Sequence, residues 1–165
     1  IETTFGFARA PENTPLFSEL KDAYLSALTN NRAEGGNKKP PTAETLEDYG
    51  RNISLFITVM GDLRIGAIDE NMVGKYFGIL KRLPAHINSA KEYRGKEIYE
   101  ILAMTPPPPP QTEANCSKKI ERISTMFKWA IDPKRRRTWG IDVNCFTGFG
   151  FITSNFAFLP SNESA

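Results

Sequence analysis

The sequence predicts an all-α protein, a bundle of four to five helices, and three observations support this class. Apolar residues recur at spacings of three and four in four separate segments, which is the period of an amphipathic helix. Residues that start or stop helices, such as Thr, Gly and Pro, border these segments. With 40% hydrophobic residues, a chain of 165 residues can bury one ordinary core. Only Phe149 to Pro160 alternates with a period near two, which predicts at most a short C-terminal strand or hairpin.

The first two helices are predicted from their apolar stripes and end signals. The first runs from Pro15 to Thr29, with Thr14 as its cap and Pro15 in its first position. Its stripe consists of Phe17, Leu20, Tyr24 and Leu28. The second runs from Thr42 to Met60, is capped by its first residue and ends at a left-handed Gly61. Its stripe consists of Leu46, Tyr49, Ile53, Phe56, Ile57 and Met60.

The middle of the chain combines one long helix, one short helix and a proline run. The long helix begins near Asp69 and is closed by Pro84. Its apolar face consists of Met72, Val73, Tyr76, Phe77, Leu80 and Leu83. Gly95 to Met104 predicts about two further turns of helix. The five residues from Pro106 to Pro110 form an extended polyproline segment, which we interpret as a stiff spacer that directs the next helix.

The last helix, from Gln111 to Ile131, is the most informative because its two faces differ in chemistry. A helical wheel groups its apolar residues within about a 100° arc. These are Ile120, Ile123, Phe127, Ala130 and Ile131. Asn115, Lys118 and Arg122 fall on the opposite side, with Lys119 at its edge. Trp129 also falls near the basic side, so we expect another segment or a further domain to cover it.

Charge and length divide the chain into one domain with two flanking segments. Residues 1–13 are predicted to be a linker or N-terminal arm, 14–148 the helical domain, and 149–165 a tail. From Thr112 to Arg137 eight basic residues stand against three acidic ones, a net charge of +5. The whole chain carries +2, so the remainder carries −3. Such asymmetry is expected where one element meets phosphate and the rest is solvated.

The sequence contains no motif of the common enzyme or metal sites. We find no phosphate-binding glycine loop, nucleophile elbow or zinc-protease motif. Cys116 and Cys145 have no metal-ligand spacing, and His86 is the only histidine. We therefore predict no cofactor, no metal and no small-molecule substrate. No apolar run reaches the roughly 18 residues of a membrane span, and no signal peptide is recognised, so we expect no membrane partner and a cytoplasmic location.

Three segments resemble the core-binding domain of phage-type integrases, which are tyrosine recombinases. In Glu44 to Pro84, ETLEDYGRNISLFITVMGDLRIGAIDENMVGKYFGILKRLP, a helix is followed by a Gly-Asp turn and a second helix that ends in Leu-Pro. Asn115 to Ile131, NCSKKIERISTMFKWAI, is similar to the last helix of that domain, with its F-x-W-A signature. Ile141 to Gly148, IDVNCFTG, stands where the family has an Asn-Pro-Phe exit, with Cys145 in place of the proline. The resemblance covers Leu16 to Gly148.

This resemblance implies a SAM-like helical bundle that forms one half of a clamp on double-stranded DNA. It also implies a separate catalytic domain, with two arginines, a histidine-containing box and a tyrosine nucleophile, and this chain has no such set. We therefore expect the chain to bind DNA without cleaving it. Its expected partners are DNA and, in the full-length recombinase, other protomers on the same DNA, at the nucleoid of a prokaryotic cell.

We predict DNA contacts from polar and basic side chains in four places, with the last long helix approaching the major groove. They are Lys38 and Lys39; Thr42, Thr45 and Arg51; Thr112, Asn115, Lys118, Lys119 and Arg122; and Arg135, Arg136 and Arg137. Alternatives stay open for several of them. Lys118 and Arg122 could be solvated only, Arg51 could pair with Glu47, and Arg135 to Arg137 could be a charged turn.

Two other classes of function remain at this point. In a protein-interaction module, the proline run or the aromatic tail would dock a partner, and binding would hardly respond to salt. In a helical enzyme domain of another kind, a concave pocket would hold titratable groups with perturbed pKa values.

Overall fold

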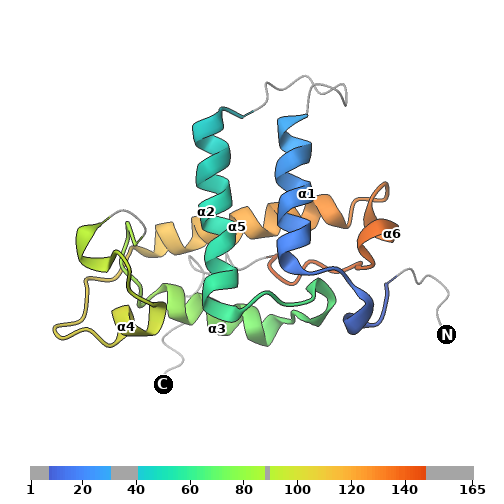
Figure 1. Cartoon of the computed structure of the whole chain (residues 1–165). Coiled ribbons are helices and arrows are strands. Elements are labelled where there is room, and N and C mark those ends of the chain that lie inside the picture. Colours follow the sequence, from blue (N-terminus) through green and yellow to red (C-terminus); the bar gives the residue numbers. More distant parts are fainter. Residues whose placement is uncertain (1–7, 31–40, 88–89, 148–165) are drawn as a thin grey trace.

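The computed structural model describes residues 8–30, 41–87 and 90–147, and these form a bundle of helices (Figure 1). The α-helices are α1 (Phe17–Thr29), α2 (Ala43–Met60), α3 (Glu70–Leu80), α4 (Ile98–Leu102), α5 (Glu113–Ala130) and α6 (Arg136–Trp139). Single 3-10 turns are η1 (Pro11–Asn13), η3 (Ile65–Ala67) and η4 (Lys91–Tyr93). Within the described residues, the extended pairing is one isolated bridge between Leu16 and Arg64. The all-α prediction is confirmed, and the aromatic tail lies outside the described residues.

The bundle consists of an antiparallel pair of helices, α1 and α2, that α5 and α3 cross. Figure 1 shows α1 and α2 side by side as an antiparallel pair, with α5 running behind both and α3 lying across their lower ends. Contacts join α1, α2 and α5 pairwise, and α3 contacts both α2 and α5. α4 and the segment before it lie beyond one end of the bundle, and α6 lies beyond the other. The first half of α5 therefore extends past α2 on the α4 side.

The core at this crossing is a cluster of phenylalanines from elements that are far apart in the sequence. The Phe56 ring of α2 stacks on Phe17 of α1 with centroids 4.7 Å apart, and it meets the edge of Tyr76 of α3 at 4.9 Å. Phe146 lies between α2 and α5, 5.6 Å from Phe56 and 4.9 Å from Phe127. One buried cluster thus joins α1, α2, α3, α5 and the segment that follows α6.

Side-chain caps begin three of the long helices. Thr42 accepts a hydrogen bond from the Thr45 N–H, as predicted, and Asp69 and Thr112 cap α3 and α5 in the same way. The predicted start of α1 is wrong, because the helix begins at Phe17 and Thr14 does not cap it.

Thr14 instead ties the residues before α1 to the turn after α2. Its buried hydroxyl donates to the Pro11 carbonyl at 2.6 Å and accepts from the Gly66 N–H at 2.9 Å. At the start of α1, the Leu16 N–H has no carbonyl partner within the helix. It donates to the Glu19 carboxylate at 2.8 Å instead. A Cβ on Gly66 would lie 2.8 Å from the Thr14 side chain, so this close approach requires glycine.

The segment after α6 is fastened to α5 by Asn144 and Phe146. The Asn144 amide donates to the Ser124 carbonyl at 3.0 Å, and its oxygen accepts from the Phe146 N–H at 3.0 Å. Cys145, which lies between them, is buried, and its thiol donates to the Ile68 carbonyl at 3.5 Å. This asparagine turn inserts the Phe146 ring into the core.

Residues 8–13 are held against the same end of the molecule. The Arg9 N–H donates to the Gly140 carbonyl at 2.9 Å, and its guanidinium donates to the carbonyls of Arg137 and Thr138, both at 2.7 Å. Gly140 has a left-handed φ of 71°, and a Cβ there would lie 2.8 Å from the Arg9 side chain. The part of the predicted N-terminal arm that is described is therefore attached to the α6 turn.

Replacing Phe146 with alanine should lower the free energy of unfolding by about 3–5 kcal/mol, because it removes a ring in contact with two other phenylalanines and leaves a cavity. The ring is 0% exposed. Urea denaturation followed by circular dichroism measures this change. Val143→Ala in the same segment is the control, since Val143 is 65% exposed and its loss should change stability by less than about 0.5 kcal/mol.

Candidate nucleic-acid interface

Two adjoining hollows open on the side of α2 that faces α4. The first, which we name the α2–α5 hollow, has a volume of about 520 Å³ and lies between α2, the first half of α5 and residues 85–87. The second, the α2–α4 hollow, has about 490 Å³ and lies between α2, Lys21 of α1 and the segment from Tyr93 to Ile101. Arg51, Leu55 and Ile87 line both. The two hollows are therefore neighbours along one surface.

The α2–α5 hollow brings together four of the residues predicted to bind DNA. Arg51 comes from α2, and Asn115, Lys118 and Lys119 come from the first two turns of α5. Lys118 is exposed, whereas Asn115 and Lys119 are partly buried. Asp48 is the acidic residue in the lining. Three cations from two crossing helices thus face one concave space.

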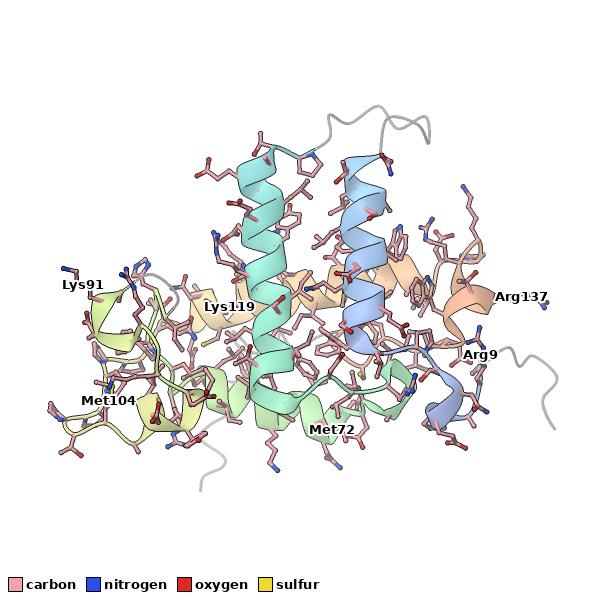
Figure 2. All side chains as sticks on the ribbon, in the orientation of Figure 1. Arg9, Met72, Lys91, Met104, Lys119 and Arg137 are labelled. Atoms are coloured by element: carbon pink, nitrogen blue, oxygen red, sulfur yellow. The ribbon has the colours of Figure 1, made fainter. Side chains whose placement is uncertain are left out.

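Lys119 is held in place by a hydrogen-bonded chain that ends at α3. Its ammonium donates to the Gln111 side-chain oxygen at 2.9 Å, and the Gln111 amide donates to the Leu80 carbonyl at 2.8 Å. The Gln111 backbone N–H also donates, to the Leu83 carbonyl at 2.9 Å. Burial lowers the pKa of Lys119 from its ordinary value. The ammonium is held by Gln111 and has lost part of its hydration. Figure 2 labels this lysine on α5, beside α2.

Arg51 pairs with Asp48 on its own helix, not with Glu47. The closest atoms, Nη2 and Oδ1, are 3.7 Å apart, and the side chains are 51% and 49% exposed. A half-exposed pair at this separation is weak, so the arginine can exchange its partner at little cost. Asp48 also accepts from the Asn52 amide at 3.4 Å. Its carboxylate is the local competitor for any anion that enters the hollow.

Arg122 lies elsewhere, packed on α2. Its guanidinium carbon is 4.1 Å from the centre of the Tyr49 ring, and its Nε is buried without a hydrogen-bond partner. The side chain is partly buried and is not among the residues that line the α2–α5 hollow. The crossing of α2 over α5 covers this position, which the helical wheel of α5 alone placed with Lys118.

The predicted threonines act at helix starts. The hydroxyl oxygens of Thr42 and Thr112 accept the capping hydrogen bonds of α2 and α5, and Thr42 also donates to the Thr45 hydroxyl at 3.0 Å. None of the three lines the α2–α5 hollow. Lys38 and Lys39 lie outside the described residues.

The predicted arginines after α5 lie at its far end, and Figure 2 shows Arg137 on the opposite side of the molecule from Lys119. Arg135 donates to the Trp129 carbonyl at 2.8 Å, lies 4.6 Å from the Trp129 ring centre and pairs with Asp132 at 3.7 Å. Arg136 and Arg137 begin the short α6, and Arg137 is exposed. The structure therefore separates the basic residues of this part of the sequence into two groups.

Other segments of the bundle pack against Trp129, which is the first of the two alternatives left open for this residue, another segment or a further domain. Its ring meets the edge of Tyr24 of α1 at 5.6 Å and lies 6.2 Å from Trp139 of α6. Phe127, by contrast, is fully within the core. Both aromatic residues of the F-x-W-A signature thus have packing roles.

The α2–α4 hollow adds cations that the sequence analysis did not single out. Lys21, Arg94 and Lys96 line it together with Arg51, opposite one acidic residue, Glu97. The segment from Lys91 to Glu97 carries three basic and two acidic residues, so it has almost no net charge as a sequence. Only the fold places Arg94 and Lys96 beside Lys21 and Arg51. No local pattern in the sequence signals this arrangement.

Comparisons with known proteins leave the family open, since no family model, curated protein or solved structure matches this chain. Among the described residues, no three His, Cys, Asp or Glu side chains are grouped so that they could hold a metal ion. In the same part of the chain, no helix is long and apolar enough to cross a membrane.

Arg122→Ala should lower the free energy of unfolding by about 1–2 kcal/mol, because it removes the guanidinium that stacks on Tyr49 between α2 and α5. Lys118→Ala, four residues earlier on the same helix but exposed, should change it by less than about 0.5 kcal/mol. Urea midpoints of both variants measure the difference. Equal midpoints would contradict a packing role for Arg122.

Proposed function

We propose that this chain binds double-stranded DNA through the α2–α5 hollow, as the core-binding domain of a phage-type integrase does, and does not itself cleave DNA. The observation that carries the proposal is the convergence of Arg51, Lys118 and Lys119 on one open, concave surface. Cations that can reach phosphates from two crossing elements are the usual means by which a protein positions itself on a duplex.

The state of Lys119 supports an anionic ligand in particular. Its ammonium is partly desolvated and has one neutral hydrogen-bond partner, the Gln111 side-chain oxygen. A phosphate oxygen would supply the charge-assisted hydrogen bond that this ammonium lacks. Arg51 and Lys118, which are more exposed, would neutralise neighbouring phosphates. Asn115 in the same lining can donate to or accept from a base edge.

The order of elements supports the integrase class. The Gly61–Asp62 turn joins α2 to η3 and α3, the F-x-W-A residues lie at the end of α5, and Asn144 and Phe146 fasten the segment beyond it. In this proposal the full-length recombinase contributes the catalytic domain. The DNA-bound assembly would contain further protomers, in the cytoplasm of a prokaryotic cell.

The proline run gives less support to a protein-interaction module. Pro108 is buried, and Pro107, Pro108 and Pro110 line a small hollow with Leu102 and with the two residues that follow α3, Lys81 and Arg82. Gln111, directly after the run, is bound to the carbonyls of Leu80 and Leu83. These contacts favour the role of a spacer that sets the start of α5, because part of the run already faces its own domain.

A catalytic site of another kind also finds little support in the described residues. The two thiols, Cys116 and Cys145, are both buried. Burial raises the pKa of Cys145 to about 12 and also raises that of Cys116, so neither thiol is activated as a nucleophile. The titratable group with a shifted pKa in the α2–α5 hollow is Lys119, whose hydrogen-bond partner is a neutral amide.

An Arg51→Ala, Lys118→Ala double variant should bind a generic labelled duplex at least about tenfold more weakly than the unmodified chain. The reason is the loss of about two phosphate contacts, each of which adds roughly −0.9 to the slope of log affinity against log salt. Fluorescence anisotropy between about 50 and 200 mM salt measures both quantities. The Arg51 side chain is 51% exposed and Lys118 is also exposed, so the fold should be kept.

The matched control is Lys75→Ala, Lys128→Ala, which removes the same charge from exposed positions that line neither hollow. It should retain most of the affinity. Equal losses in the two double variants would mean that only net charge matters, and absence of binding by the unmodified chain at low salt would overturn the proposed function.

Asp48→Asn should raise DNA affinity severalfold. The change removes the carboxylate that lines the α2–α5 hollow and pairs with Arg51 at 3.7 Å, while it keeps the shape of the side chain. The same anisotropy titration detects the gain. Glu44→Gln at an exposed position in the first turn of α2 removes one negative charge outside the hollow and serves as the control. Unchanged or weaker binding by Asp48→Asn would contradict the placement of DNA in this hollow.

A further inference from the structure

The α2–α4 hollow is bordered by a tight turn whose geometry is set by its sequence, Tyr93-Arg94-Gly95-Lys96. The Lys96 N–H donates to the Tyr93 carbonyl at 3.2 Å, which closes a four-residue turn. Arg94 has φ −66° and ψ 130°, and Gly95 has φ 79°. These angles define a type II turn, whose third position requires a positive φ and therefore favours glycine.

Apolar anchors hold this turn in place on both sides. Tyr93, the first residue of the turn, is buried, and Ile101 of α4, after the turn, is also buried. Ile98, at the start of α4, packs partly buried against the same core. Arg94 and Lys96, by contrast, are exposed and line the hollow. The turn therefore presents two cations from a backbone that is fixed at both ends.

The opposite wall of the hollow also offers hydrogen-bond donors. Lys21 of α1 donates to the Ser54 hydroxyl of α2 at 3.1 Å, and its side chain is 22% exposed. Its nearest carboxylate, Asp22, is 3.8 Å away and largely exposed, so the ion pair is weak. Arg51 borders the hollow on the side shared with the α2–α5 hollow. Four cations from three parts of the chain surround a space lined by one carboxylate, that of Glu97.

We propose that the Tyr93–Lys96 turn is a second phosphate-binding element, which grips the DNA backbone beyond the α2–α5 hollow. This inference rests on the proposed function and extends it, because it assigns a longer path to the duplex. The path runs from Lys118 and Lys119, past Arg51, to Arg94, Lys96 and Lys21. Arg51 is the point where the two contacts meet, since it lines both hollows.

The test is an anisotropy titration of the full chain with a labelled duplex long enough to cover both hollows, comparing the unmodified chain with Arg94→Ala, Lys96→Ala. The double variant should bind about tenfold or more weakly, and its salt slope should be smaller by about 1 to 2, as expected for the loss of one or two phosphate contacts. Lys75→Ala, Lys128→Ala is again the charge-matched control, and thermal melting of each variant confirms that the fold is kept.

A second variant separates the conformation of the turn from its charge. Gly95→Ala keeps both cations, and no atom lies within 4 Å of the new Cβ, so it acts through backbone strain at a positive φ. It should weaken binding severalfold. Unchanged affinity in this variant would overturn the role of the turn geometry.

The two proposals fail in different ways. If Arg94→Ala, Lys96→Ala binds as tightly as the control while Arg51→Ala, Lys118→Ala does not, the second element is overturned and the proposed function stands. If the unmodified chain does not bind the duplex at about 50 mM salt, both are overturned together.

Discussion

The contact on which the rest of the structure depends is the aromatic packing where α2 crosses α5. Phe56 of α2 and Phe127 of α5 are linked through two further rings, since Phe146 lies between them and Phe17 contacts both. Aromatic rings at such separations add to the free energy gained from their burial. The crossing fixes the direction of α5, and so it decides that the first half of this helix extends beyond α2 toward α4 (Figure 1). The α2–α5 hollow lies at that overhang, since Asn115, Lys118 and Lys119 of α5 form part of its lining.

Hydrogen bonds from Gln111 also help to fix the position of α5, in addition to the aromatic cluster. Gln111 binds the carbonyls of Leu80 and Leu83, so the beginning of α5 is fixed to the end of α3. The same side chain holds the ammonium of Lys119. The hydrogen bonds of a buried amide offset the free energy of removing it from water. If its partners moved away, that free-energy cost would remain, so the partners are held together. The position of the candidate DNA contact is thus set by the fold rather than by the lysine alone.

The sequence was enough to predict the helices because period and caps are local properties. Thr42 caps α2, the inward face of α5 carries Ile120, Ile123 and Phe127, and the short helix α4 lies within the predicted stretch. Thr14 was assigned wrongly because its partner, Gly66, is far away in the sequence and offers a backbone N–H that no pattern reveals.

The candidate site was predicted only in part, for the same reason. Lys118, Lys119 and Arg51 meet as cations on one surface, but a wheel of α5 cannot show that α2 covers Arg122. Arg94 and Lys96 lie between Glu92 and Glu97, so the segment has almost no net charge and gave no signal in the sequence. Only the packing of Tyr93 and Ile101 places them opposite Lys21. The basic face of α5 could be predicted from the sequence. The grouping of cations that are far apart in the sequence could not, because it depends on how the helices pack.

The central claim, that a duplex lies against the α2–α5 hollow, is tested most directly by mapping amide chemical shifts in nuclear magnetic resonance spectra as DNA is added. The account predicts that the largest changes fall in residues 48–55 of α2 and 115–119 of α5, with few at Arg136–Trp139. Changes confined to the α6 end, or spread evenly over the surface, would contradict it.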